Sequence, residues 1–171
     1  MSQETFQHEL SHSTKLNNKH RGELAELAFM RKAAAMGFSV AKPWGDSERY
    51  DVVLRSGKVF WRIQVKSVKS KAPQRKHYRV MTRNWLGLPY NPDEIDFLVA
   101  YIFPEDAWYV FPVQVVENRK TLYINPAAKR SKLHKYREAW DLLKQSCAEP
   151  TPGEAPALAP AVAQDPGTAG L

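Results

Sequence analysis

Cysteine is almost missing from this sequence, since Cys147 is the single one among 171 residues. A lone cysteine excludes an internal disulfide framework, and no group of cysteines and histidines has the spacing of a zinc site. Long apolar runs are missing as well, because none approaches the roughly 18 residues that a membrane-spanning helix needs. The N-terminus is polar and unlike a secretory signal peptide. We therefore expect a soluble, intracellular, cytoplasmic protein with no membrane partner.

Acidic residues are scarce relative to basic ones. The chain has 18 Asp and Glu against 25 Lys and Arg, a net charge of +7. Residues 148–171 hold three of these acids and no Lys or Arg, which leaves residues 1–147 with a net charge of +10. Such a balance favours a polyanionic partner, usually nucleic acid. The plainer alternative is that the charge serves solubility alone.

Residues 148–171 are poor in everything that a fold requires. They consist mostly of Ala, Pro, Gly and Thr and contain no aromatic residue. Repeated prolines block helices and central strands, and the apolar mass is too small to fold. A chain of this length favours one domain. We expect a polar, flexible N-terminus at 1–16, one folded domain at 17–147 and a disordered tail at 148–171.

The folded part alternates between helical and extended patterns. Leu24, Leu27, Ala28 and Met30 recur at helical spacing, and glycine commonly follows the end of a helix. The predicted elements are a helix at 17–36 ending before Gly37, strands at 38–42, 49–55 and 59–68 with a turn at 56–58, strands at 77–83, 96–103 and 108–113, and a closing helix at 131–145. Helix, strands and helix in this order indicate an α/β layer structure with a mixed sheet.

Polar side chains interrupt three of these apolar segments. Asp51 lies on the strand at 49–55, and Gln64 and Lys66 share one face of the next strand because side chains alternate. The hairpin between these strands brings Asp51 next to Gln64. Glu26 lies on the helix that would pack against this sheet. Burying such groups without partners is costly, so their combination indicates a site.

These residue types suit the cleavage of a phosphodiester bond. A divalent ion held by oxygen ligands can make water nucleophilic and neutralise the developing charge. We expect Mg²⁺, with Mn²⁺ as a substitute, and Asp51 as the central ligand. The carbonyl oxygens of the Gln64 side chain and the Val65 backbone would complete the set, with Glu26 holding a second ion or a water. Lys66 would position the attacking water and stabilise negative charge.

A structural alternative stands beside this interpretation. An Asp and a Lys on neighbouring strands most often form a partly exposed cross-strand ion pair. The apolar context of Ile63, Val65 and Val68 and the helix with its Gly-x-x-x-Glu spacing favour the site. Glu23 is a substitute for Glu26, because it lies on nearly the same helix face.

The sequence resembles the PD-(D/E)XK nuclease superfamily over roughly residues 18–145. More narrowly, it is similar to PD-(D/E)XK endonucleases related to group I intron homing enzymes, and more distantly to archaeal Holliday-junction resolvases. The matching stretches are Arg21–Ala28, Gly37–Val40 with Pro43, Arg49–Val53, Ile63–Ser67, 108–112 and 136–140. The resemblance implies a restriction-endonuclease-like α/β core, with a mixed central sheet flanked by helices, and hydrolysis that leaves a 5′-phosphate.

The same resemblance implies a catalytic quartet of Glu26, Asp51, Gln64 and Lys66. The chain departs from the superfamily signature at Tyr50, which replaces proline, and at Gln64, which replaces Asp or Glu. The amide at Gln64 removes one negative charge and should weaken metal binding. The homing-type family is similar in having Gln here. A catalytically inactive binding module of the same fold therefore stays open, as does a nuclease acting on junctions or in repair.

A run of basic residues follows Lys66 and is expected to contact the phosphate backbone of DNA. Its members are Lys69, Lys71, Arg75, Lys76 and Arg79. A solvated loop is the alternative for this run. Because each chain would carry one site, cutting both strands of a duplex suggests a homo-oligomer, either a dimer or a tetramer.

Overall fold

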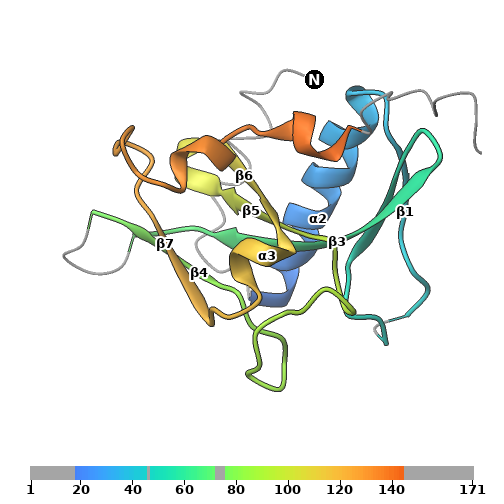
Figure 1. Ribbon diagram of the computed structural model, residues 1–171, viewed down its shortest axis with the longest axis horizontal. Coiled ribbons are helices and arrows are strands. Elements are labelled where there is room, and N and C mark those ends of the chain that lie inside the picture. Colours follow the sequence, from blue (N-terminus) through green and yellow to red (C-terminus); the bar gives the residue numbers. More distant parts are fainter. Residues whose placement is uncertain (1–17, 46, 72–75, 145–171) are drawn as a thin grey trace, which may run out of the picture.

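The computed structural model describes residues 18–45, 47–71 and 76–144. Its core is a five-stranded mixed sheet in the order β1-β2-β3-β5-β6, with helix α2 against one face (Figure 1). The bounds are α2 (Asn18–Ala35), β1 (Ser39–Ala41), β2 (Val52–Ser56), β3 (Val59–Val68), β5 (Phe97–Ile102) and β6 (Ala107–Pro112). The predicted mixed α/β fold is confirmed. The segment at 1–16, the tail at 148–171 and Arg75 lie outside the described residues.

Strand β3 organises the sheet. It pairs antiparallel with β2, with Val52 opposite Ile63, and parallel with β5, with Gln64 opposite Leu98. The turn between β2 and β3 contains Gly57 at a φ of +61°, a left-handed conformation that favours glycine. The predicted hairpin is therefore present, although β2 begins at Val52 rather than at residue 49.

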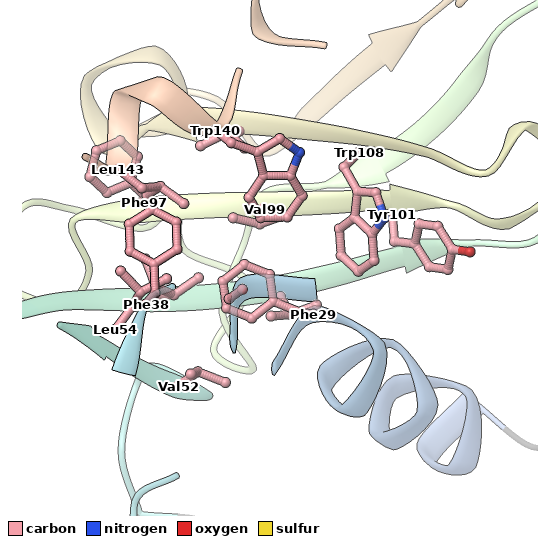
Figure 2. Close-up of a cluster of buried hydrophobic side chains, with 14 of the residues drawn as sticks. Phe29, Phe38, Val52, Leu54, Phe97, Val99, Tyr101, Trp108, Trp140 and Leu143 are labelled. Atoms are coloured by element: carbon pink, nitrogen blue, oxygen red, sulfur yellow. The ribbon is translucent and has the colours of Figure 1, made fainter. Parts of the chain in front are cut away.

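Helix α2 packs on the sheet through Ala25, Phe29 and Ala33, which recur every four residues and are fully buried. Figure 2 shows Phe29 among the side chains of Val99, Trp108 and Trp140. The expectation that Leu27 belongs to the apolar face is wrong, because this side chain is 57% exposed. The buried stripe consists of small residues around one phenylalanine, which lets the helix approach the sheet closely.

A second layer covers the opposite face of the sheet. Strand β4 (Tyr78–Met81) pairs antiparallel with β7 (Thr121–Ile124), and their inward side chains pack on Leu98 and Ala100 of β5. All six residues of β5 are buried for this reason. Strand β7 and the short helix α3 (Val113–Val116) are not among the predicted elements.

The predicted closing helix at 131–145 is wrong over the residues that the structure describes. Two short 3₁₀ helices replace it, η2 (His134–Tyr136) and η3 (Trp140–Leu143). Between them Glu138 has a φ of +50°, and its backbone N–H donates to the Trp108 carbonyl at 2.8 Å. This contact with β6 removes Glu138 from helical geometry. The apolar spacing at Tyr136 and Trp140 reflects burial against the sheet rather than a continuous helix.

Helix α2 is amphipathic rather than uniformly apolar, and within 18–45, 47–71 and 76–144 no helix is both long and apolar enough to cross a membrane.

Candidate active site

The site residues surround an open pocket of about 820 Å³. Helix α2, the loop before β2, the end of β3 and the edge of β4 form its walls. The pairing of β2 with β3 ends at Val52 and Ile63, while β3 continues to Val68 beside β5. The edge of β3 next to β2 is consequently left open from Gln64 onward. This opening is where the pocket meets the sheet.

Asp51 occupies the position just before β2. Its backbone N–H donates to the Ile63 carbonyl at 2.9 Å, which keeps it in register opposite Gln64. Its carboxylate Oδ2 accepts the Val65 N–H at 2.8 Å and a hydrogen bond from Gln64 Nε2. Burial raises the pKa of Asp51 to about 6, and the nearby charge of Glu26 adds to that rise. The Val65 N–H and the positive charge of Lys66 act in the opposite direction.

Gln64 is buried, with 6% of its surface exposed. Its Nε2 lies 3.3 Å from the Val65 carbonyl oxygen while it also donates to Asp51 Oδ2. Two oxygen atoms therefore converge on one group that carries partial positive charge. That is the arrangement expected of oxygen atoms able to share a cation. The predicted neighbourhood of Asp51, Gln64 and Val65 is present in the fold.

Glu26 reaches the same pocket from α2. Its Oε2 accepts a hydrogen bond from Lys42 Nζ at 2.6 Å. This bond raises the pKa of Lys42, although burial opposes the rise. Lys42 is a pocket residue that the sequence reasoning missed. Its signal was its place at the end of the predicted strand at 38–42, directly before Pro43.

Lys66 lies two residues beyond Gln64 on β3 and lines the pocket. Burial lowers the pKa of Lys66, whereas the charges of Asp51 and Glu26 raise it, and the net direction is down. Its Nζ lies 5.2 Å from the ring centroid of Tyr90, which is buried. The sequence interpretation of Tyr90 as part of a turn missed this contact. Glu23, the predicted substitute for Glu26, also lines the pocket and lies 3.6 Å from His20 Nδ1.

Part of the predicted basic run reaches the pocket. Lys69, Lys71 and Arg79 line it, whereas Lys76 is exposed and outside its lining. Lys71 also lies 3.5 Å from Glu105 Oε1, so part of its charge is already paired.

Two further basic residues line the pocket from α2, and the sequence reasoning did not single them out. They are Lys19 and Arg21. Lys19 precedes Glu26 by seven residues, which is two helical turns. Helical spacing could therefore have placed it on the same face as Glu26.

The donor set fits a hard divalent cation. It offers the carboxylates of Glu26 and Asp51, the amide oxygen of Gln64 and the carbonyl of Val65. Oxygen ligands of this kind suit Mg²⁺ or Mn²⁺ better than zinc. No group of three or more His, Cys, Asp or Glu side chains is clustered in the described part of the chain, so two carboxylates are what the fold brings together here.

Comparisons with known proteins agree with this geometry. The PD-(D/E)XK endonuclease family matches residues 16–143. The solved structure of a bacterial homing endonuclease, I-Ssp6803I, is 32% identical, with a TM-score of 0.68 over 75% of this chain and 93% of that one. A Holliday junction resolvase, Hjc of Archaeoglobus fulgidus, is 21% identical, with a TM-score of 0.42 over 61% of this chain and 84% of that one. No curated protein matches the sequence.

Proposed function

Because this chain belongs to the PD-(D/E)XK endonuclease family, we propose that its substrate is DNA and that it needs a divalent metal ion, Mg²⁺ or Mn²⁺, in the pocket described above. The nuclease domain would span residues 17–147. The observation that carries this proposal is the convergence of Asp51 Oδ2 and the Val65 carbonyl on the amide of Gln64. A buried carboxylate with a raised pKa is a charge that a cation would stabilise.

The residues would hold the metal as follows. Asp51 and the Val65 carbonyl already face one point, and Gln64 would present its amide oxygen instead of its nitrogen. Glu26 would contribute once Lys42 moves away from it. When bound, a divalent ion supplies positive charge that polarises the phosphate and makes water more nucleophilic.

Lys66 has the role closest to the reacting bond. Its ammonium shares the pocket with Asp51 and Glu26, and their charges keep it protonated against the effect of burial. From there it would hold the attacking water and stabilise the extra negative charge that develops on the phosphate oxygens. Its lowered pKa makes it a better proton donor than an exposed lysine. Lys69, Lys71 and Arg79 would contact the flanking phosphates, as would Arg75 and Lys76.

Duplex DNA is the substrate form that the comparison favours. The structure that is 32% identical belongs to a homing endonuclease. An enzyme with one pocket per chain needs a second copy to cut both strands, so we propose a dimer or a tetramer. The alternative is a non-catalytic DNA-binding module, which the amide at Gln64 favours because it lowers the negative charge available to a metal.

A plasmid assay tests this proposal. Supercoiled DNA would be incubated with the protein and Mg²⁺, Mn²⁺ or EDTA, in parallel with a Holliday junction and linear duplexes. We expect metal-dependent cleavage that Lys66→Met abolishes without loss of DNA binding. Lys144→Met is the matched control, because it removes a lysine that pairs with Asp141 at 2.7 Å and is outside the pocket lining. Cleavage by Lys66→Met at the wild-type rate would contradict the proposed site.

A further inference from the structure

The loop between β4 and β5 exposes an apolar tip. Trp85 is 80% exposed, Leu86 51% and Leu88 53%. Three large apolar side chains within four residues form the tip, and Figure 1 shows this loop projecting at the bottom of the view, away from the sheet. Single exposed apolar residues are ordinary, but a cluster of this kind marks an interaction site.

The tip is held in a fixed shape by Asn84. Its side-chain Oδ1 accepts the N–H groups of Leu86 and Leu88 at 3.0 and 3.2 Å. Its backbone N–H donates to the Leu88 carbonyl at 2.8 Å, and its Nδ2 donates to Glu94 Oε1 at 3.2 Å. Because these bonds close the loop on itself, the apolar side chains are displayed on a preorganised turn. A preorganised surface loses less entropy when it binds a partner.

The loop is also tied to the proposed active site. The guanidinium carbon of Arg49 lies 5.3 Å from the centroid of the Trp85 ring, and Arg49 Nε lies 3.7 Å from Glu94 Oε1. Arg49 precedes Asp51 by only two residues. At the other end of the loop, Tyr90 lies against Lys66. The apolar tip and the proposed catalytic residues are therefore linked through two short stretches of chain.

The size and charge of the tip favour DNA over a protein partner. One tryptophan and two leucines cover far less than the roughly 800 Å² per partner of a stable protein interface. Arg49 and Arg83 flank the tip and carry charge complementary to phosphate. Apolar side chains of this kind act as wedges between DNA base steps, which they unstack and kink.

We propose that the Trp85 tip is a wedge that inserts at a base step of duplex DNA beside the bond to be cut. This inference rests on the proposed function, since it assumes that duplex DNA occupies the pocket. Insertion would distort the duplex locally and align the scissile phosphate with Lys66. Trp85 would then be a positioning residue, because it acts on the reacting phosphate through the shape of the DNA.

Fluorescence of 2-aminopurine tests the wedge directly. The analogue would be placed at successive positions of a duplex that carries a site cut in the plasmid assay, and binding would be measured in EDTA, where cleavage does not proceed. We expect a several-fold rise in fluorescence at one step with the wild type, and loss of that rise with Trp85→Ala. An equal rise with Trp85→Ala would overturn the inference.

Phe60 provides the matched control. It is an aromatic side chain that is 63% exposed, and the guanidinium of Arg55 lies 5.9 Å from its ring centroid, so it reproduces the surroundings of Trp85 away from the pocket. Phe60→Ala should retain the fluorescence rise. Leu88→Ser is a second variant that leaves the contact between Arg49 and Trp85 in place, and it should reduce the rise if the tip inserts as a unit.

The outcomes separate this inference from the proposed function. Cleavage in the plasmid assay together with an unchanged fluorescence signal in Trp85→Ala would overturn the wedge alone. Wild-type protein that neither binds nor cuts any duplex would overturn both. A change from oligomer to monomer in sedimentation of free Trp85→Ala would assign the tip to contacts between copies and would also overturn the wedge.

Discussion

Asp51 and Glu138 are two partly buried carboxylates whose pKa values move in opposite directions. Each accepts a hydrogen bond from a strand N–H, Asp51 from Val65 and Glu138 from Trp108. Burial raises the pKa of Asp51 to about 6. Burial acts in the same sense on Glu138, but its hydrogen bonds outweigh it and lower the pKa.

The difference lies in the donors. Glu138 accepts charge-assisted hydrogen bonding from Lys32 Nζ at 2.8 Å, besides Trp140 Nε1 at 2.8 Å. The hydrogen bonds to Asp51 come from a backbone N–H and an amide, which are uncharged. Glu138 therefore fastens the C-terminal segment to α2 and β6. Asp51 keeps an incompletely compensated charge, which lowers stability and leaves the carboxylate ready for a cation.

Replacing Asp51 by Asn removes that charge and should have the largest effect. We expect the rate of DNA cleavage to fall about 1,000-fold, as when one charge-stabilising group is removed from an active site. Single-turnover rates on supercoiled plasmid would measure it. Glu138→Gln makes the same change of carboxylate to amide outside the pocket, and its rate should equal that of the wild type. Equal loss in both variants would mean that folding, rather than the site, had been disturbed.

The same variant should be more stable than the wild type without metal. The pKa of Asp51 is about 6 in the folded protein and ordinarily 3.8, and one pKa unit corresponds to about 1.36 kcal/mol. The folded protein retains a proton that the unfolded chain releases between these values, so wild-type stability falls as pH rises through that window. Urea unfolding should therefore show Asp51→Asn to be more stable by about 3 kcal/mol at pH 8, with a smaller difference at pH 4. A variant that is less stable at both pH values would contradict this.

Glu138→Gln should reverse the sign of that effect. The side chains of Glu138 and Lys32 are 39% and 36% exposed, so solvent screens their pair, and we expect a loss of about 1 kcal/mol at pH 7. Because the pKa of Glu138 lies below its ordinary 4.5, this stabilisation is complete above pH 4.5 and is lost as pH falls through the folded pKa. Thermal unfolding measures it, with Asp141→Asn as the control, since that side chain is 88% exposed.

The comparison also explains what the sequence could predict. Asp51, Gln64 and Lys66 lie on one local hairpin and its second strand, so alternation along the strands was enough to bring them together. Glu26 follows from the packing of α2. The structure agrees with these neighbourhoods because each depends on short-range periodicity.

The contacts that sequence reasoning missed depend on distant parts of the chain. The predicted helix at 131–145 fails because Glu138 bonds to Trp108, thirty residues away. Strand β7 forms because β4 offers it a partner, and its own four residues carry too little pattern to show it. Lys42 joins the site through a side-chain pair with Glu26 on another element. Such pairings are set by tertiary packing and leave little trace in local spacing.

Lys42→Met should have the smallest effect on stability and the most informative one on the metal. Lys42 is 49% exposed, so losing its pair with Glu26 should change the free energy of unfolding by less than about 1 kcal/mol. The carboxylate of Glu26, however, would no longer be neutralised by an ammonium 2.6 Å away. Mn²⁺ should then bind a few-fold more tightly, as measured by electron paramagnetic resonance of free Mn²⁺, with Lys144→Met unchanged.

The outcome decides on which side of the comparison Lys42 belongs. Tighter Mn²⁺ binding at unchanged stability would mean that Lys42 holds the place of a cation at Glu26, just as the Gln64 amide does at Asp51. Weaker Mn²⁺ binding together with a clear loss of stability would instead mean that Lys42 fastens Glu26 in position, as Lys32 fastens Glu138. Metal binding would then need the ion pair intact, and the proposal that Glu26 is released to the metal would be wrong.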